Sequence, residues 1–216
     1  MLQYLIVLLD DTSTSFCHYT NKKTERKLIS LSDLNEAILF SLKRNLTLQF
    51  IYPDYALPQE YINMIETVLH NKISLSTAVE IKKTDMVVIS DWKDVQNLLF
   101  NEETIYIWRV PKDDFFNHSD LVIKILEKVV RLNIITDIET FDKEDFEDYQ
   151  RVLNTLSDGV EKLYAEGKEG QLNLLTDRMM LKKMNNCNAG WESITLAPDG
   201  KFYICPAFYQ EGSCSV

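Results

Sequence analysis

Strand-like and helix-like patterns alternate along the first three quarters of this 216-residue chain, and this alternation constrains its fold more than any other feature. Short apolar runs typical of buried strands are followed by stretches in which apolar residues recur every three or four positions. Strands that alternate with helices favour parallel βαβ units with right-handed crossovers. The sequence therefore predicts an α/β fold with a mainly parallel sheet over residues 1–166, as an open sheet or an incomplete (β/α) barrel.

The pattern places five strands, at residues 3–9, 46–52, 86–89, 104–110 and 132–138. Helices are expected from Ser32, from Pro58, over 92–100, from Ser119, and from Asp142 to about Glu166. Ser32 is the expected N-cap of the first helix, and Ile62, Ile65 and Leu69 are assigned to one face of the second. We expect the strands to end together at Asp10, Tyr52, Ser90, Val110 and Ile138.

Composition indicates an ordinary globular protein and argues against two classes of partner. Hydrophobic residues make up 45% of the chain and charged residues 26%. The formal net charge of −10 is opposite to the basic surface that nucleic acids require, so no nucleic-acid partner is expected. The apolar run Met1–Leu9 is too short to span a membrane and lacks the basic flank of a signal peptide. We expect a buried strand there, no membrane association, and a reducing cytoplasm as the compartment.

Glycine is missing from most of the chain. All six glycines lie at or after Gly159. A P-loop, a dinucleotide-binding fingerprint and the Gly-Gly-Glu-Pro loop of radical SAM enzymes all need glycine where the backbone approaches a phosphate or cofactor closely. The sequence therefore excludes these loops from residues 1–158.

Three of the four cysteines, Cys187, Cys205 and Cys214, lie in the last thirty residues. Two short strands, 193–197 and 201–204, flank a turn in which Gly200 is expected to take a positive φ. This hairpin would return Cys205 toward the segment that carries Cys187. Without a secretory signal, such a group favours ligands of an iron–sulfur cluster or a zinc ion over disulfides. The alternative is three ordinary, partly buried thiols.

The pattern Cys-x12-Gly-x4-Cys, from Cys187 through Gly200 to Cys205, resembles the opening of the SPASM domain. This is the auxiliary iron–sulfur region of many radical SAM peptide maturases, in which further cysteines downstream complete one or two clusters. Here the chain ends at Val216, so the resemblance implies a SPASM-like region that is begun and not finished. It also implies two domains: a partial, radical SAM-like (β/α) barrel over 1–183 and a SPASM-like hairpin region over 184–216.

The first strand is followed by Asp10-Asp-Thr-Ser-Thr-Ser-Phe-Cys17-His18-Tyr19. Radical SAM enzymes carry a Cys-xxx-Cys-xx-Cys loop at this place, which holds the catalytic cluster. If Cys17 corresponds to the middle ligand, Ser13 and Thr20 occupy the other two positions. Binding of SAM by this stretch is therefore not expected.

Together, the segment Tyr4–Tyr19 and the SPASM-like end resemble the CXXX repeat peptide maturases, a bacterial family associated with small precursors that carry cysteine at every fourth residue. The resemblance implies that the partner is a ribosomally made precursor peptide. Two hypotheses stay open: a peptide maturase with an auxiliary metal or iron–sulfur region, or a catalytically silent subunit that binds the precursor peptide, with or without a structural zinc.

Weaker candidates lie at the ends of the first two strands. Asp10, Asp11, Cys17 and His18 follow the first strand and Asp54 follows the second, at the edge where parallel sheets place their sites. Cys17 and His18 could form a thiolate–base pair, but neighbours on an extended segment point in opposite directions. The acidic run over 137–148 is read as a solvated helix start, and alternatively as a docking surface for a basic leader peptide.

Overall fold

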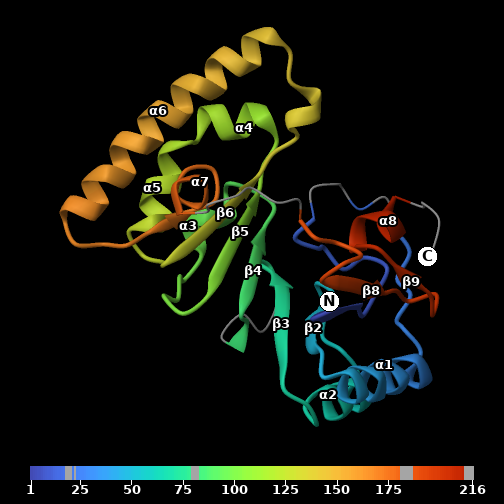
Figure 1. Cartoon of the computed structure of the whole chain (residues 1–216). Coiled ribbons are helices and arrows are strands. Elements are labelled where there is room, and N and C mark those ends of the chain that lie inside the picture. The colour runs from blue at the N-terminus through green and yellow to red at the C-terminus, as the bar shows by residue number, and fades with distance from the viewer. Residues whose placement is uncertain (18–20, 22, 79–82, 181–186, 212–216) are drawn as a thin grey trace. The chain divides into compact units, whose positions relative to one another are not determined.

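The computed structural model describes residues 1–17, 21, 23–78, 83–180 and 187–211, which fall into two compact units. The first unit combines the N-terminal residues up to Asp85 with the C-terminal residues from Asn185, and the second comprises Met86–Met184. Each unit has parallel strands and helices of its own (Figure 1). The division into domains at residues 183 and 184 stays a prediction.

The first unit contains five strands in the order β3-β2-β1-β8-β9. Neighbouring strands pair in parallel, except for the antiparallel pair β8–β9. The strands are β1 (Tyr4–Leu8), β2 (Thr47–Ile51), β3 (His70–Leu75), β8 (Ser193–Leu196) and β9 (Phe202–Tyr203); the helices are α1 (Leu31–Arg44), α2 (Gln59–Ile65) and α8 (Pro206–Gln210). Residues from opposite ends of the sequence therefore share one sheet, with β1 between β2 and β8.

The core of this unit lies between the sheet and the helices α1 and α2. Apolar side chains from every second position of β1 and β2 meet the apolar faces of the two helices, as the two-residue and 3.6-residue periods require. The buried cluster includes Leu5, Val7, Leu9, Leu34, Ile38, Leu48, Phe50, Ile65 and Leu196. This packing fixes the carboxyl ends of β1 and β2 side by side.

Helix α1 begins two residues earlier than predicted. Ser30, not Ser32, is the N-cap, and its hydroxyl accepts a hydrogen bond from the Asp33 amide at 3.0 Å. The helix ends at Asn45, which adopts the left-handed conformation with φ of 53°. Serine at the start and a left-handed residue at the end are the usual helix boundaries.

Helix α2 is shorter than predicted, and the strand after it was not predicted. The helix ends at Ile65, and the Leu69 side chain, assigned to its apolar face, is 99% exposed. The next residues form β3, which pairs with β2 through Leu48–His70 and Ile51–Ile73. This strand begins with three polar residues, His70, Asn71 and Lys72, so the sequence lacks the apolar run that would have indicated it.

The second unit contains four parallel strands in the order β7-β6-β5-β4. They are β4 (Met86–Ile89), β5 (Ile105–Arg109), β6 (Arg131–Ile135) and β7 (Gln171–Leu172). The helices of this unit are α3 (Asp94–Asn97), α4 (Lys112–Asn117), α5 (Asp120–Leu126), α6 (Lys143–Ala165) and α7 (Thr176–Met180), with a 3-10 turn at Ile138–Thr140. The predicted end of a strand at Ile138 is wrong, because β6 ends at Ile135 and this turn follows.

Helix α6 is the longest element and begins where predicted. Asp142 is its N-cap, accepting hydrogen bonds from the amides of Glu144 and Asp145, and the Asp145 carboxylate accepts one from the Asp142 amide in return. Gly159 lets this helix approach α5, since a Cβ there would lie 2.7 Å from the Ile123 side chain. Reciprocal capping and close packing together hold α6 on its unit.

The predicted C-terminal hairpin is present as β8 and β9. Gly200 closes it with φ of 79°, and the Lys201 carbonyl accepts a hydrogen bond from the Ala197 amide at 3.1 Å. The predicted α/β class with mainly parallel strands and a C-terminal hairpin is confirmed. Among the described residues, no helix is long and apolar enough to cross a membrane.

Candidate functional site

The carboxyl end of β1 carries a buried polar cluster, which we call the β1-end network and define as Asp10, Asp11, Thr12, Ser13, Ser15, Tyr55, Tyr209 and Gln210. Asp10 is fully buried. Its carboxylate accepts hydrogen bonds from the Thr12 amide and hydroxyl and, at 2.8 Å, from the Tyr55 hydroxyl. The Ser13 hydroxyl donates to the carbonyl of Ile51 at the end of β2. These contacts tie the loop after β1 to the neighbouring strand.

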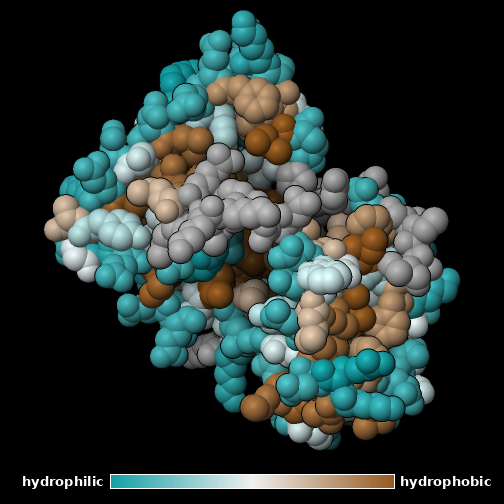
Figure 2. Space-filling model, in the orientation of Figure 1, coloured by the Kyte–Doolittle hydropathy of each residue, from teal (hydrophilic) through white to brown (hydrophobic). Residues whose placement is uncertain are grey.

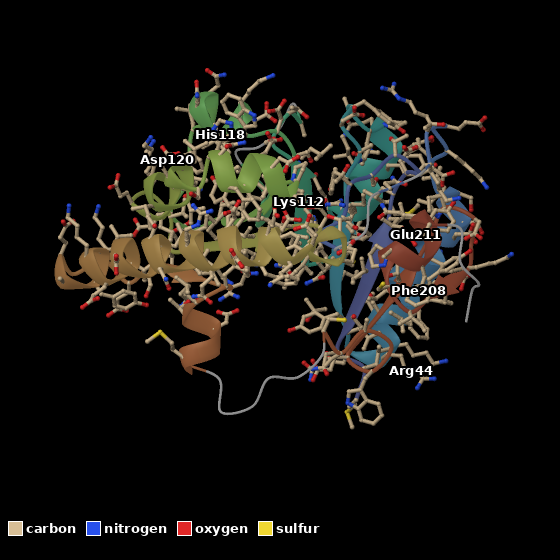
Figure 3. The ribbon with its side chains drawn as sticks, turned by 90° about the horizontal axis from the view of Figure 1, so that it is seen from above. Arg44, Lys112, His118, Asp120, Phe208 and Glu211 are labelled. Carbon is tan, nitrogen blue, oxygen red and sulfur yellow. The ribbon has the colours of Figure 1, made fainter. Side chains whose placement is uncertain are left out.

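Helix α8 closes the network from the other end of the sequence; Phe208 and Glu211 mark its position in Figure 3. The Tyr209 hydroxyl donates a hydrogen bond to the Asp11 carboxylate. The Gln210 amide donates to the Ser13 carbonyl at 2.6 Å, and its oxygen accepts from the Ser15 hydroxyl at 3.1 Å. The loop after β1 is thus held by side chains almost two hundred positions away.

Two tyrosines of this network have raised pKa values. Burial and the hydrogen bond to Asp10 raise the pKa of Tyr55, and burial and the hydrogen bond to Asp11 raise that of Tyr209. Both effects disfavour a phenolate, because it would lie in a desolvated place beside a carboxylate. At neutral pH both tyrosines therefore act as hydrogen-bond donors.

Cys17 and Cys205 meet beside this network. The two sulfur atoms are joined by a hydrogen bond, which together with burial raises the pKa of Cys17 well above its usual range. The same hydrogen bond, with help from the amides of Phe208 and Ala207, lowers the pKa of Cys205 to about 6.

Two other predicted site residues, Cys187 and Asp54, are not among the residues that form this arrangement. Cys187 is exposed. Asp54 lies on the surface, half exposed, with Arg26 at 3.8 Å. His18 and Cys214 lie outside the described residues. Of the predicted residues that the structure describes, four lie in or beside the β1-end network: Asp10, Asp11, Cys17 and Cys205.

The residues around β1 do not fit a radical SAM cluster. Such a cluster is held by cysteine thiolates, and the described part of this loop contains one cysteine, Cys17, whose sulfur is hydrogen-bonded to Cys205. Ser13, at a corresponding position, is buried and donates its hydroxyl to a carbonyl. Within the described ranges, no group of three His, Cys, Asp or Glu residues is placed to hold a metal ion. The prediction that Cys187, Cys205 and Cys214 together bind metal stays a prediction, because Cys214 is outside these ranges.

A pocket of about 510 Å³ lies in the first unit, beside the end of β2. Its wall is formed by the Tyr52–Leu57 loop, α2 and β3. The Lys72 ammonium lies 4.5 Å from the centre of the Tyr52 ring. The Ser74 hydroxyl, also in the wall, is buried and has no hydrogen-bond partner among the described residues. A volume in this range suits a small ligand or a few peptide side chains.

Exposed apolar side chains are spread over the first unit. They include Leu39, Leu42, Trp191, Phe202 and Phe208. Figure 2 shows apolar atoms interspersed with polar ones over the region of β8, β9 and α8. Scattered apolar residues are normal on protein surfaces, so the pocket and the β1-end network remain the features with a defined local chemistry.

The chain is similar in structure to SuiB from Streptococcus suis. The crystal structure of SuiB bound to precursor peptide SuiA aligns with all of this chain and 62% of SuiB, with a TM-score of 0.55 and 13% identity. SuiB bound to S-adenosylmethionine gives a TM-score of 0.56 and 13% identity over 63% of that protein, and a third SuiB structure gives 0.51 and 14%. The chain thus spans less than two thirds of the length of SuiB.

No protein-family model matches the chain, and no curated protein matches it in sequence. At 13–14% identity the similarity to SuiB shows the fold. Together with the strand order, it confirms the predicted fold class, a mainly parallel α/β fold with a C-terminal hairpin.

Sequence reasoning missed Tyr55, Tyr209 and Gln210. Tyr55 follows the predicted end of β2 by three positions, so its place beside Asp10 could have been found from the parallel strand order. Tyr209 and Gln210 gave no such signal, because their contacts depend on α8 folding back onto the loop after β1.

Proposed function

We propose that this chain takes part in the maturation of a ribosomally made precursor peptide, and that its part is to bind the peptide. The observation that carries the proposal is the similarity of the whole chain to SuiB, one structure of which is a complex with a precursor peptide. The finer proposal is that the peptide belongs to the cysteine-repeat class, which rests on the resemblance to the CXXX repeat peptide maturases.

The β1-end network supports peptide binding over radical chemistry. In radical SAM enzymes the loop after the first strand must present three thiolates to a cluster. Here Asp10 and Asp11 are satisfied by tyrosine hydroxyls and Ser13 by a carbonyl, so the loop is stabilised without a cofactor. This arrangement favours the catalytically silent subunit over the peptide maturase with its own SAM cluster.

We propose the pocket beside β2 as the contact for one segment of the peptide. The Tyr52 ring offers an apolar surface, and the Ser74 hydroxyl, which has no hydrogen-bond partner in the described part of the chain, offers a hydrogen bond to a peptide carbonyl or amide. An unsatisfied buried hydroxyl is costly, so a ligand that satisfies it gains affinity. The same pocket is also lined by charged residues of both signs, Lys72, Lys83 and Asp85. These can pair with the charged groups of a polar peptide.

Binding is tested with a fluorescently labelled cysteine-repeat precursor peptide and a scrambled peptide of equal composition. Fluorescence anisotropy is expected to show saturable binding of the repeat peptide and at least tenfold weaker binding of the scrambled one, about 1.4 kcal/mol. Tyr52→Ala should weaken binding about tenfold. Tyr164→Ala, which removes a partly exposed tyrosine of α6 in the second unit, is the matched control and should leave it unchanged. Equal affinity for both peptides would refute the proposal.

Two further measurements separate the hypotheses on cofactors. After anaerobic iron–sulfur reconstitution, incubation with SAM and a reductant is expected to give no 5′-deoxyadenosine above the protein-free control. Metal analysis of the purified chain and of a Cys187→Ala variant tests the C-terminal metal prediction. Stoichiometric iron or zinc that is lost in the variant would support a metal at Cys187, Cys205 and Cys214.

A further inference from the structure

The pairing of Cys17 with Cys205 is not used by the proposed function. The two residues lie at opposite ends of the sequence, one in the loop after β1 and one directly before α8. Their sulfur atoms nevertheless share a hydrogen bond. We propose that Cys17 and Cys205 form a reversible redox pair, which closes into an intramolecular disulfide between the loop after β1 and α8.

The surroundings of the pair hold both cysteines in place. On one side, the Cys17 amide donates to the Ser15 hydroxyl at 3.3 Å, and that hydroxyl donates in turn to Gln210. On the other, Gln210 also donates to the Ser13 carbonyl, and Tyr209 donates to Asp11. These contacts cross from the loop to α8 within six residues of each cysteine, so the two segments are kept together without a covalent bond. Proximity of this kind favours an intramolecular disulfide over mixed disulfides with small thiols.

The chemistry needs one external oxidant, a low-molecular-weight disulfide. Cys205 gives up its proton, and the resulting thiolate attacks one sulfur of this disulfide, forms a mixed disulfide and releases one small thiolate. Cys17 then gives up its proton and attacks the Cys205 sulfur, which expels the second small thiolate. Two protein S–H bonds are replaced by one S–S bond, and two electrons and two protons reduce the oxidant to two thiols.

Cys187 is expected to react differently from Cys17 and Cys205. Cys187 is exposed, and among the described residues no other cysteine is disulfide-bonded to it. An exposed, unpaired thiol is expected to stop at the mixed disulfide, whereas Cys205 proceeds to the intramolecular bond because Cys17 is already in contact with it.

The test is a redox titration of the full chain with mixtures of oxidised and reduced glutathione, followed by alkylation of the remaining thiols and non-reducing peptide mapping. The expected product is a cross-linked peptide pair that contains Cys17 and Cys205, with a mass lower by two hydrogens, while Cys187 is recovered alkylated or glutathionylated. In Cys17→Ser the cross-link should be lost and Cys205 should accumulate as the mixed disulfide. Cys187→Ser, the matched control, should keep the cross-link.

A second variant tests whether α8 positions the pair. Gln210→Ala is expected to slow closure at least fivefold, seen as longer-lived glutathione adduct on Cys205, while Gln150→Ala on the surface of α6 should close at the wild-type rate. The proposal is overturned if Cys205 links to Cys187 or Cys214 instead of Cys17, or if Cys205 and Cys187 give mixed disulfides alone in the wild type. None of these outcomes depends on peptide binding, so the redox pair and the proposed function can fail separately.

Discussion

The loops that follow the parallel strands are ordered in different ways in the two units. After β1, the carboxylate of Asp11 is satisfied by Tyr209, which is 198 positions away. After β5, the Lys112 amide is satisfied by Asp137, which is 25 positions away, and the Lys112 ammonium by Asp145, 33 positions away. The first loop depends on the C-terminal segment, and the second is completed within its own unit.

This difference has a consequence for function. A loop held by local contacts keeps its shape as long as its unit is folded. A loop held by α8 can be released when α8 moves, since Tyr209 and Gln210 leave together. Movement of α8 would then remove the hydrogen-bond donor of Asp11 at the carboxyl end of β1, where sheets of this kind place their sites.

The largest effect is expected for Asp10→Ala. This change leaves the partly buried hydroxyls of Tyr55 and Thr12 without the fully buried carboxylate that accepts from them, and the loss is expected to be about 3 kcal/mol in the free energy of unfolding of the first unit. Urea unfolding gives the global value, and hydrogen exchange of peptides from β1 and from α6 shows which unit is affected. Asp54→Ala, at a half-exposed ion pair, is the control and should change stability by less than about 0.5 kcal/mol. Equal losses in both variants would mean that the β1-end network does not stabilise the unit.

The next effect tests the dependence on α8. Tyr209→Phe removes one hydroxyl that donates to a buried carboxylate, and about 2 kcal/mol should be lost. A double-mutant cycle with Asp11→Asn isolates the contact, and hydrogen exchange of the loop after β1 should accelerate in Tyr209→Phe. Tyr164→Phe, at a partly exposed tyrosine of α6, should leave exchange in both units unchanged. Slow exchange of the loop in Tyr209→Phe would show that the loop is ordered without α8.

The raised pKa values of Tyr55 and Tyr209 predict sensitivity to alkaline pH. A raised pKa means that the folded state binds the phenol proton more tightly than the unfolded chain does, so this stabilisation is complete below the unfolded pKa of about 10 and is lost as pH rises above it. The stability difference between the wild type and Tyr55→Phe should therefore shrink above about pH 10. Urea unfolding followed by circular dichroism at neutral and alkaline pH measures it. A difference that stays constant with pH would contradict the prediction.

Sequence reasoning succeeded where the signal was local. The start of α6 at Asp142 was predicted from acidic residues at a helix N-terminus, and Gly200 was predicted at the hairpin turn; both lie as expected. It placed the cap of α1 at Ser32 instead of Ser30, because two serines two positions apart carry the same capping preference.

It did not find the features that depend on distant segments. Strand β3 was not predicted because its first residues are polar, and it is stabilised by its pairing with β2. The contact of Cys17 with Cys205 was not predicted either, because the resemblance to radical SAM enzymes assigned the two residues to separate cofactor sites. Side-chain contacts between such distant residues follow from the folded topology, which a pattern of local periodicity does not contain.

The smallest effect is expected in the second unit, where the loops are ordered locally. Asp142→Ala removes the N-cap of α6 and its hydrogen bonds to the amides of Glu144 and Asp145, and about 1 kcal/mol should be lost. Exchange should accelerate in the first turn of α6 and remain unchanged in β1, because the hydrogen bonds that Asp142 makes with the described residues Glu144 and Asp145 stay within its own unit. Asp158→Ala, an exposed position in the middle of the same helix, should be neutral or slightly stabilising, since alanine has the higher helix propensity. If Asp142→Ala also accelerated exchange in β1, the two units would be coupled, and the contrast between a locally ordered and a remotely ordered loop would be wrong.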